Sequence, residues 1–200
     1  NALRRALGKK HVAPPEDMIY GEHYDLLNKR VWERKKKEAK DRTAFLNHYS
    51  PTCRSFSYVQ AQYQQRSMEA PYGVPDKVKG PLRESVTADS KLAVRVAALC
   101  KIHHQLGDAF SIEHVWPTPM LQFSSFEKLL QMPGVFLFTW DNCAYGEKYR
   151  HRQVLITNCP FLAVLSKDCS GDHEHQTIGF GKEIQTHELA PFSYGWFDAY

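Results

Sequence analysis

Residues 87–115 read TADSKLAVRVAALCKIHHQLGDAFSIEHV, and this stretch decides the fold class. Over its first two thirds, side chains three or four positions apart fall on one stripe, which is the spacing of a helix face. The stripe consists of Leu92, Val96, Leu99 and His103. Gly107 predicts the C-terminal end of this helix. Residues 109–113 then predict a short strand that ends on the carboxylate of Glu113.

The elements on either side of this helix and strand continue the alternation. The sequence predicts a strand at residues 44–49, a long loop at 54–84, a short helix at 123–132, and strands at 135–140 and 154–157. Strands that alternate with helices predict an α/β sheet. A polar stretch connects the last two strands, which favours an antiparallel hairpin over a helical crossover.

The chain divides into three expected parts. Residues 1–43 form an irregular lead-in and a basic helix, residues 44–158 form the core, and residues 159–200 form a C-terminal segment that contains Cys and His. Positive charge gathers near the end of the first part, on Lys29, Arg30, Arg34, Lys35, Lys36, Lys37, Lys40 and Arg42. Such a run either faces a nucleic acid or forms a solvated helix face, and the second is commoner.

The composition is that of a globular protein. Of the 200 residues, 42% are hydrophobic, and the net charge of +4 favours polyanion partners without specifying one. No apolar run reaches the roughly 20 residues that a membrane helix needs, and the first residues lack the apolar core of a signal peptide. The five cysteines lack the spacing of a disulfide scaffold. We therefore expect an intracellular protein, nuclear or cytoplasmic, with reduced thiols and no membrane partner.

Three short segments carry residues suited to chemistry. Cys53-Arg54-Ser55-Phe56-Ser57 follows the first predicted strand, Glu113-His114-Val115 ends the next, and Arg150-His151-Arg152 leads into the last. Ligands of open α/β sheets bind outside the carboxyl ends of the strands. We therefore expect Cys53 and Glu113 to lie together at that edge.

These segments resemble those of the DNA cytosine-5 methyltransferases, which carry Pro-Cys-Gln-x-Phe-Ser, Glu-Asn-Val and Gln-x-Arg-x-Arg in the same order. The resemblance covers roughly residues 44–158. It implies a partial Rossmann-like methyltransferase sheet, comprising its central and C-terminal half, with an irregular C-terminal segment. It also implies DNA as the partner, with RNA as an alternative, and S-adenosylmethionine as the cofactor.

The resemblance assigns roles to individual residues. Cys53 would add to C6 of a cytosine flipped out of the stack, and Glu113, with a raised pKa, would hold or protonate N3. Arg152 and Arg150 would bind the base carbonyl. The remaining candidates for substrate contact are Arg54, which would also lower the pKa of Cys53, together with Ser57 and His114. The loop at 54–84 would cover the base with Tyr58, Tyr63 and Tyr72.

The sequence departs from the family pattern in three places. Thr52 stands where a proline precedes the nucleophile, and His114 stands where an asparagine shapes the catalytic loop. The Phe-x-Gly-x-Gly loop that holds S-adenosylmethionine is absent ahead of Cys53, and the nearest glycine pairing, Gly179 and Gly181, comes late. We therefore expect that a missing segment or a partner chain supplies the cofactor half.

A metal site is predicted near the C-terminus. Cys169, His173 and His175 lie within seven residues, and Cys159 or Cys143 would complete the four ligands of a structural zinc ion. The alternative is a polar surface turn around Gly171. Similar methyltransferase-like segments with a Cys-x-x-x-His-x-His tail occur in retroelement-type polyproteins.

Three functions compete on this sequence. The first is a cytosine methyltransferase, or an inactive relic of one. The second is a basic, zinc-stabilised nucleic-acid-binding module in which Cys53 is structural. The third is a thiol hydrolase that would pair Cys53 with His103, His104 or His114.

Overall fold

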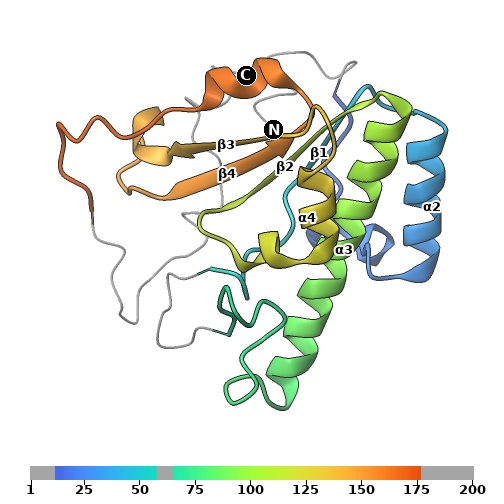
Figure 1. Cartoon of the computed structure of the whole chain (residues 1–200). Coiled ribbons are helices and arrows are strands. Elements are labelled where there is room, and N and C mark those ends of the chain that lie inside the picture. Colours follow the sequence, from blue (N-terminus) through green and yellow to red (C-terminus); the bar gives the residue numbers. More distant parts are fainter. Residues whose placement is uncertain (1–11, 58–64, 177–200) are drawn as a thin grey trace.

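A computed structural model describes residues 12–57 and 65–176, which form a four-stranded open sheet covered by helices (Figure 1). The strand order is β1-β2-β4-β3. The strands are β1 at Leu46–Tyr49, β2 at Ala109–Val115, β3 at Phe136–Asp141 and β4 at Arg152–Thr157. β1 and β2 are parallel, whereas β4 runs antiparallel to both of its neighbours. The predicted α/β class and the predicted hairpin of the last two strands are confirmed.

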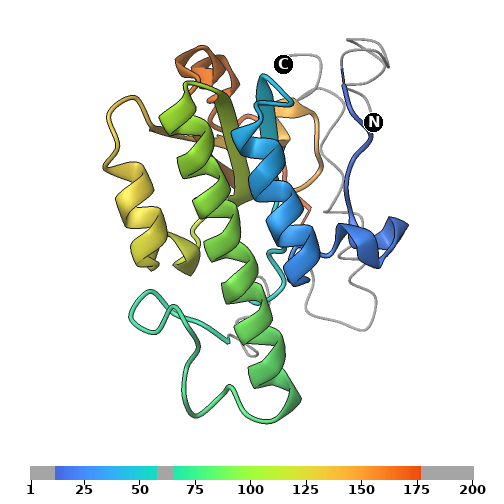
Figure 2. The same ribbon diagram turned by 90° about the vertical axis from the view of Figure 1, so that its right-hand side faces the viewer.

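Three helices lie side by side on one face of the sheet (Figure 2). They are α2 at Lys29–Lys40, α3 at Pro81–Leu106 and α4 at Ser124–Leu130. α3 begins six residues earlier than expected, because Pro81 suits a first helical turn, where its missing N–H has no intrahelical partner. Gly107 ends the helix in the left-handed conformation, at a φ of 77°. The predicted end of this helix is therefore confirmed.

Short 3-10 helices connect these elements. They are η1 at Met18–Tyr20, η2 at Glu22–Tyr24, η4 at Pro119–Gln122, η5 at Asn142–Tyr145 and η6 at Pro160–Leu165. None of the helices in the described ranges is long and apolar enough to cross a membrane.

Side chains alternate between two hydrophobic clusters, one on each face of the sheet. The cluster on the helix face includes Val96, Ala97, Phe110, Ile112, Phe126, Val154 and Ile156. The cluster on the opposite face includes Ala109, Trp140, Tyr145, Leu155, Leu162 and Leu165. Leu162 and Leu165 belong to η6, so the first residues after position 158 pack as part of the core.

Several cations of the basic run of α2 form ion pairs within the chain. Lys35 pairs with Glu16 and Glu38, and Lys36 and Lys37 pair with acidic neighbours on the same helical segment. Val31 and Ala39 are buried on the other side of the helix, which contacts α3. The helix therefore has one buried face and one solvated face that carries the charges.

Candidate functional site

Ser50 and Glu113 meet at the carboxyl end of the parallel strand pair. Tyr49 pairs with Ile112, so the next residue of each strand lies at the same level. The Ser50 hydroxyl donates a hydrogen bond to Glu113 Oε2 at 2.6 Å. Cys53 follows three residues later, close enough for the Glu113 carboxylate to affect its pKa. Cys53 and Glu113 therefore lie near the same edge of the sheet, within electrostatic range of each other.

Glu113 is a buried acid, with a side chain only 9% exposed. Burial disfavours its charged form and raises its pKa to about 7, although the hydrogen bond from Ser50 acts in the opposite direction. A substantial fraction of Glu113 is therefore protonated at neutral pH. This agrees with the expectation of an acid that works near pH 7.

Gln153 is the second polar neighbour of Glu113, and sequence analysis missed it. The Gln153 amide is oriented so that its nitrogen faces two oxygen acceptors. Nε2 then lies 2.7 Å from Glu113 Oε1 and 2.8 Å from the carbonyl oxygen of His114. The strand register could have revealed this residue. Glu113 pairs with Leu155, and residues two apart on a strand share a face, so Gln153 lies on the face of Glu113.

The same alternation places Arg152 on the opposite face, away from Glu113. Its guanidinium donates to Thr139 Oγ1 at 3.0 Å and to Asp168 Oδ1 at 2.6 Å. Arg150 and Arg152 both lie within 3.6 Å of the buried Asp141 carboxylate. The expected grouping of both arginines with Cys53 and Glu113 is therefore not observed.

Cys53 lies on an exposed turn whose carbonyl oxygen accepts hydrogen bonds from the N–H groups of Phe56 and Ser57, each at 2.9 Å. Protein atoms around the thiol reduce its hydration and, with the Glu113 carboxylate, raise the pKa of Cys53 above its usual value. Arg54 was expected to lower this pKa, but its guanidinium pairs with the buried Asp89 on α3 at 3.1 Å. Cys53 is therefore a protonated thiol at neutral pH.

Arg66 fixes the loop that follows Cys53, and no sequence signal pointed to it. Its side chain is 1% exposed and lies over the Phe56 ring, 4.0 Å from the ring centroid. Its guanidinium donates to Ser55 Oγ, Ser90 Oγ and the carbonyl oxygens of Pro71 and Val86. These bonds connect the turn at Cys53 to the N-terminal half of α3.

His114 packs beneath the same turn. Its buried ring meets the Phe56 ring edge-on at a centroid distance of 5.3 Å and lies against the backbone of Thr52 and Val115. Burial lowers the pKa of His114 to about 4, so the imidazole is neutral. His114 therefore packs against the turn that carries Cys53.

Two of the histidines that a thiol hydrolase would need contact groups other than Cys53. His103 Nε2 lies 2.9 Å from the Tyr49 hydroxyl, and His104 Nδ1 lies 3.4 Å from the Asn158 amide. The buried His114 ring packs against Phe56 and the backbone of Thr52 and Val115. The structure thus offers no support for a Cys–His dyad among these candidates.

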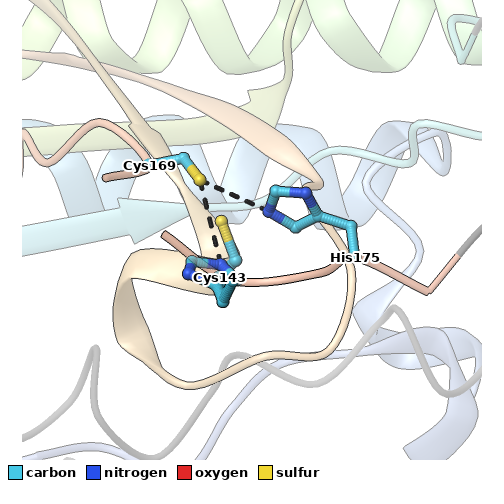
Figure 3. Close-up of side chains that lie close together, drawn as sticks. Cys143, Cys169 and His175 are labelled. Atoms are coloured by element: carbon cyan, nitrogen blue, oxygen red, sulfur yellow. Dashed lines mark hydrogen bonds between the residues drawn. The ribbon is translucent and has the colours of Figure 1, made fainter. Parts of the chain in front are cut away.

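A second group of side chains gathers beside η5. One ligand atom each from Cys143, Cys169, His173 and His175 lies within 4.8 Å of the others. The Cys169 sulfur is 3.8 Å from His173 Nε2 and 3.3 Å from His175 Nε2. Figure 3 shows Cys143, Cys169 and His175 converging on one region. These four residues could hold a metal ion.

The cluster contains Cys143 rather than Cys159, the other residue that the sequence offered as a fourth ligand. Cys159 precedes η6 and packs with Trp140 and Leu155 in the cluster on the far face of the sheet. Burial of Cys143, followed by the adjacent Cys169 thiol, raises the pKa of Cys143 to about 11.

Several other predicted features lie outside the described residues. These are Tyr58, Tyr63, Gly179 and Gly181. Tyr72 is described, and its ring stacks on Phe123 at a centroid distance of 4.3 Å. Comparisons with protein-family models, with curated proteins and with solved structures found no match for this chain.

Proposed function

We propose that this chain is a divergent DNA cytosine-5 methyltransferase-like domain whose Cys53–Glu113 edge binds and covalently activates a cytosine base. One observation carries the proposal: a buried acid with a pKa of about 7 lies beside an exposed thiol at the carboxyl edge of a parallel strand pair. The sheet is compatible with the proposal, because a parallel pair followed by an antiparallel hairpin is the arrangement expected of the C-terminal half of a Rossmann-like methyltransferase sheet.

The chemistry requires only residues of this edge and water. The Cys53 thiolate forms a bond to C6, the C5–C6 π electrons move into the ring, and Glu113 delivers its proton to N3. C5 of the resulting enamine can then take a proton from water and lose one again. Reversal breaks the S–C6 bond and returns the proton to Glu113. The Ser50 hydroxyl can donate or accept, so Glu113 keeps a partner in both protonation states.

The two pKa values limit the rate of this addition. The reaction needs a charged Cys53 and a protonated Glu113, but the pKa of the thiol is raised above its usual value whereas that of the acid is about 7. Only a small fraction of molecules then holds the reactive combination at any pH. We therefore expect slow addition unless the bound base changes the surroundings of the thiol.

S-adenosylmethionine does not fit the residues that precede Cys53 in the structure. In the family it lies against a glycine-rich loop that follows a strand. Here residues 12–45 form η1, η2, α2 and turns, and the Cβ position of Gly21 is blocked by the His23 ring at 2.7 Å. Methyl transfer therefore needs a segment outside the described residues or a partner chain.

Exchange of the cytosine C5 hydrogen for solvent deuterium tests the proposal without a methyl donor. The full chain is incubated in deuterated buffer with a single-stranded cytosine oligonucleotide, and exchange is measured by mass spectrometry. We expect Cys53→Ser to abolish exchange and Glu113→Gln to slow it at least about a hundredfold. Cys159→Ser is the matched control and should retain it. Exchange at the rate of free thiol in buffer, or equal exchange in Cys53→Ser, would refute the proposal.

Calorimetric titration with S-adenosylmethionine addresses the cofactor separately. Saturation at a hundredfold the dissociation constant would add about 2.7 kcal/mol to the free energy of unfolding. Binding would show that this chain holds a cofactor site of its own. Exchange without such binding would indicate that the base-binding half works alone.

The second candidate is a zinc-stabilised nucleic-acid-binding module, and the Cys/His cluster favours it. Two thiols and two imidazoles suit zinc. The internal ion pairs of α2 weaken the basic surface that this function needs. Nucleic-acid binding that is lost on zinc removal but unaffected by Cys53→Ser would support this function over the first.

A further inference from the structure

We infer that Cys143, Cys169, His173 and His175 form a closed, tetrahedral zinc site that anchors residues 166–176 to the end of β3. This inference does not depend on the chemistry of Cys53. It assigns a structural role, because four protein ligands leave no position for substrate or water.

The spacing of the ligand atoms agrees with zinc geometry. Zn–S bonds of about 2.3 Å and Zn–N bonds of about 2.1 Å at tetrahedral angles separate sulfur from nitrogen by about 3.6 Å. The two distances from the Cys169 sulfur, 3.8 Å to His173 Nε2 and 3.3 Å to His175 Nε2, lie on either side of this value. Only small side-chain movements are needed to place an ion between them.

The residues around the cluster orient its ligands. Nδ1 of His173 lies 3.0 Å from the Asp172 carboxylate, which leaves Nε2 directed at the cluster. A carboxylate on the far nitrogen is the usual support of a zinc-bound histidine. The N–H of Gly171 donates to the Cys169 sulfur at 3.3 Å, a bond that stabilises a thiolate. Both contacts favour the ligand form of their residue.

The segment that carries three of the ligands is held by polar contacts and has no buried residue. Leu165 is the last buried residue of the described chain, since every residue at 166–176 is exposed or only partly exposed. Hydrogen bonds connect it to β3, β4 and the loop between them. Backbone groups form three of these: Asp141 N–H to Lys167 O, Cys169 N–H to Asp141 Oδ2, and Gln176 N–H to Lys148 O. Side chains form two more: Ser166 Oγ donates to Thr139 O, and Arg152 donates to Asp168 Oδ1. A metal ion would supply the attachment that a hydrophobic core supplies elsewhere.

The site also fixes the two arginines at the start of β4. The backbone N–H of Cys169 donates to Asp141 Oδ2, and this oxygen is the one that Arg150 and Arg152 approach. Asp168, the residue before the ligand Cys169, holds Arg152 from the other side. Zinc binding would therefore fix the positions of both guanidinium groups as well as the C-terminal segment.

Metal content and cobalt spectroscopy of the full chain, purified under reducing conditions, test the inference. We expect one equivalent of zinc per chain and, after exchange with Co²⁺, the visible d–d bands of a tetrahedral ion with thiolate-to-cobalt charge transfer. Cys169→Ser and His175→Asn should lose these bands. Glu174→Gln, which changes an exposed residue between the two histidines, and Cys159→Ala should retain them.

Asp172→Asn tests the supporting carboxylate. It should weaken zinc affinity about tenfold to a hundredfold while the ligand set and the cobalt spectrum are unchanged. A folded wild-type chain that shows neither zinc nor cobalt bands would overturn the inference. Bands that survive Cys143→Ala but disappear in Cys159→Ala would overturn the ligand set. Neither result involves the cytosine exchange assay, so the two proposals can fail separately.

Discussion

The turn at Cys53 and the segment at Cys169 both present thiols outside the sheet, but they are held in different ways. The buried guanidinium of Arg66 connects the first to α3 through four acceptors. The second has no buried residue beyond Leu165 and gathers four metal ligands instead. The Cys53 turn thus depends on the folded core, whereas we propose that the Cys169 segment depends on an ion.

This difference separates two uses of cysteine. Cys53 is a single exposed thiol beside an acid, an arrangement that suits reversible addition to a base. Cys143 and Cys169 lie together with two imidazoles, an arrangement that suits a closed metal site. The reactivity of Cys53 should therefore depend on pH and little on metal. The order of the Cys169 segment should depend on metal and little on pH.

Zinc removal should produce the largest effect and should act on one of the two regions. With free zinc at about a thousandfold its dissociation constant, the ion adds about 4 kcal/mol to the free energy of unfolding. Treatment with a chelator should remove this contribution to the free energy of unfolding. It should also abolish hydrogen-exchange protection at residues 166–176. Protection of the Phe56 and Ser57 amides should not change. Equal loss at both regions would show that the two are not held independently.

The pH dependence of stability should sharpen the comparison from the side of Cys53. Glu113 has a pKa of about 7 in the folded chain and 4.5 as its ordinary value, so the unfolded chain releases its proton first. Stability should therefore fall as the pH rises from about 4.5 to about 7 and then level off, by about 3 kcal/mol in all.

Glu113→Gln should remove this contribution, which is measured as the difference between the urea unfolding curves of variant and wild type across that range. Glu174→Gln, at an exposed carboxyl, should leave the dependence unchanged. A wild-type profile identical to that of Glu113→Gln would contradict the raised pKa.

Local sequence patterns predicted the α/β class, and the folded chain contains the elements that these patterns indicate. The helix before Gly107, the strand at Glu113 and the final hairpin all follow from periodicity and turn residues. Cys53 and Glu113 could be paired because the carboxyl ends of parallel strands meet at one edge. The pairing of three C-terminal metal ligands followed from their short separation in sequence.

What the sequence could not provide was register and tertiary contact. The expected role of Arg152 depended on which face of β4 it occupies. A shift of the strand register by one residue would place Arg152 on the face where Gln153 lies. Arg66 lies in a segment rich in Pro and Gly that has no periodicity, so its burial could not be inferred. The choice of Cys143 over Cys159 depended on how η5 and η6 pack against the sheet.

Substitution of Arg66 should break the support of Cys53 and leave the metal cluster intact. Arg66→Met removes every donor and leaves buried carbonyl and hydroxyl oxygens without their partner, at a cost of about 2 kcal/mol. Amide exchange at Phe56 and Ser57 should accelerate, while the cobalt spectrum should not change. Arg66→Lys keeps a charge and some donors and should cost less. An unchanged urea midpoint for Arg66→Met would show that these bonds do not hold the loop.

The smallest effect is expected at Arg54, the nearest cation to Cys53 in sequence. Its ion pair with Asp89 is exposed on the arginine side but buried on the aspartate side, so Arg54→Ala should cost about 1–2 kcal/mol. The pKa of Cys53 should remain above its usual value, because burial and Glu113 set it. The pH dependence of iodoacetamide alkylation, followed by mass spectrometry, measures this directly. If Arg54→Ala raised that pKa by about a full unit, the thiolate would be stabilised by Arg54. Cys53 would then be a more reactive nucleophile than its present surroundings indicate.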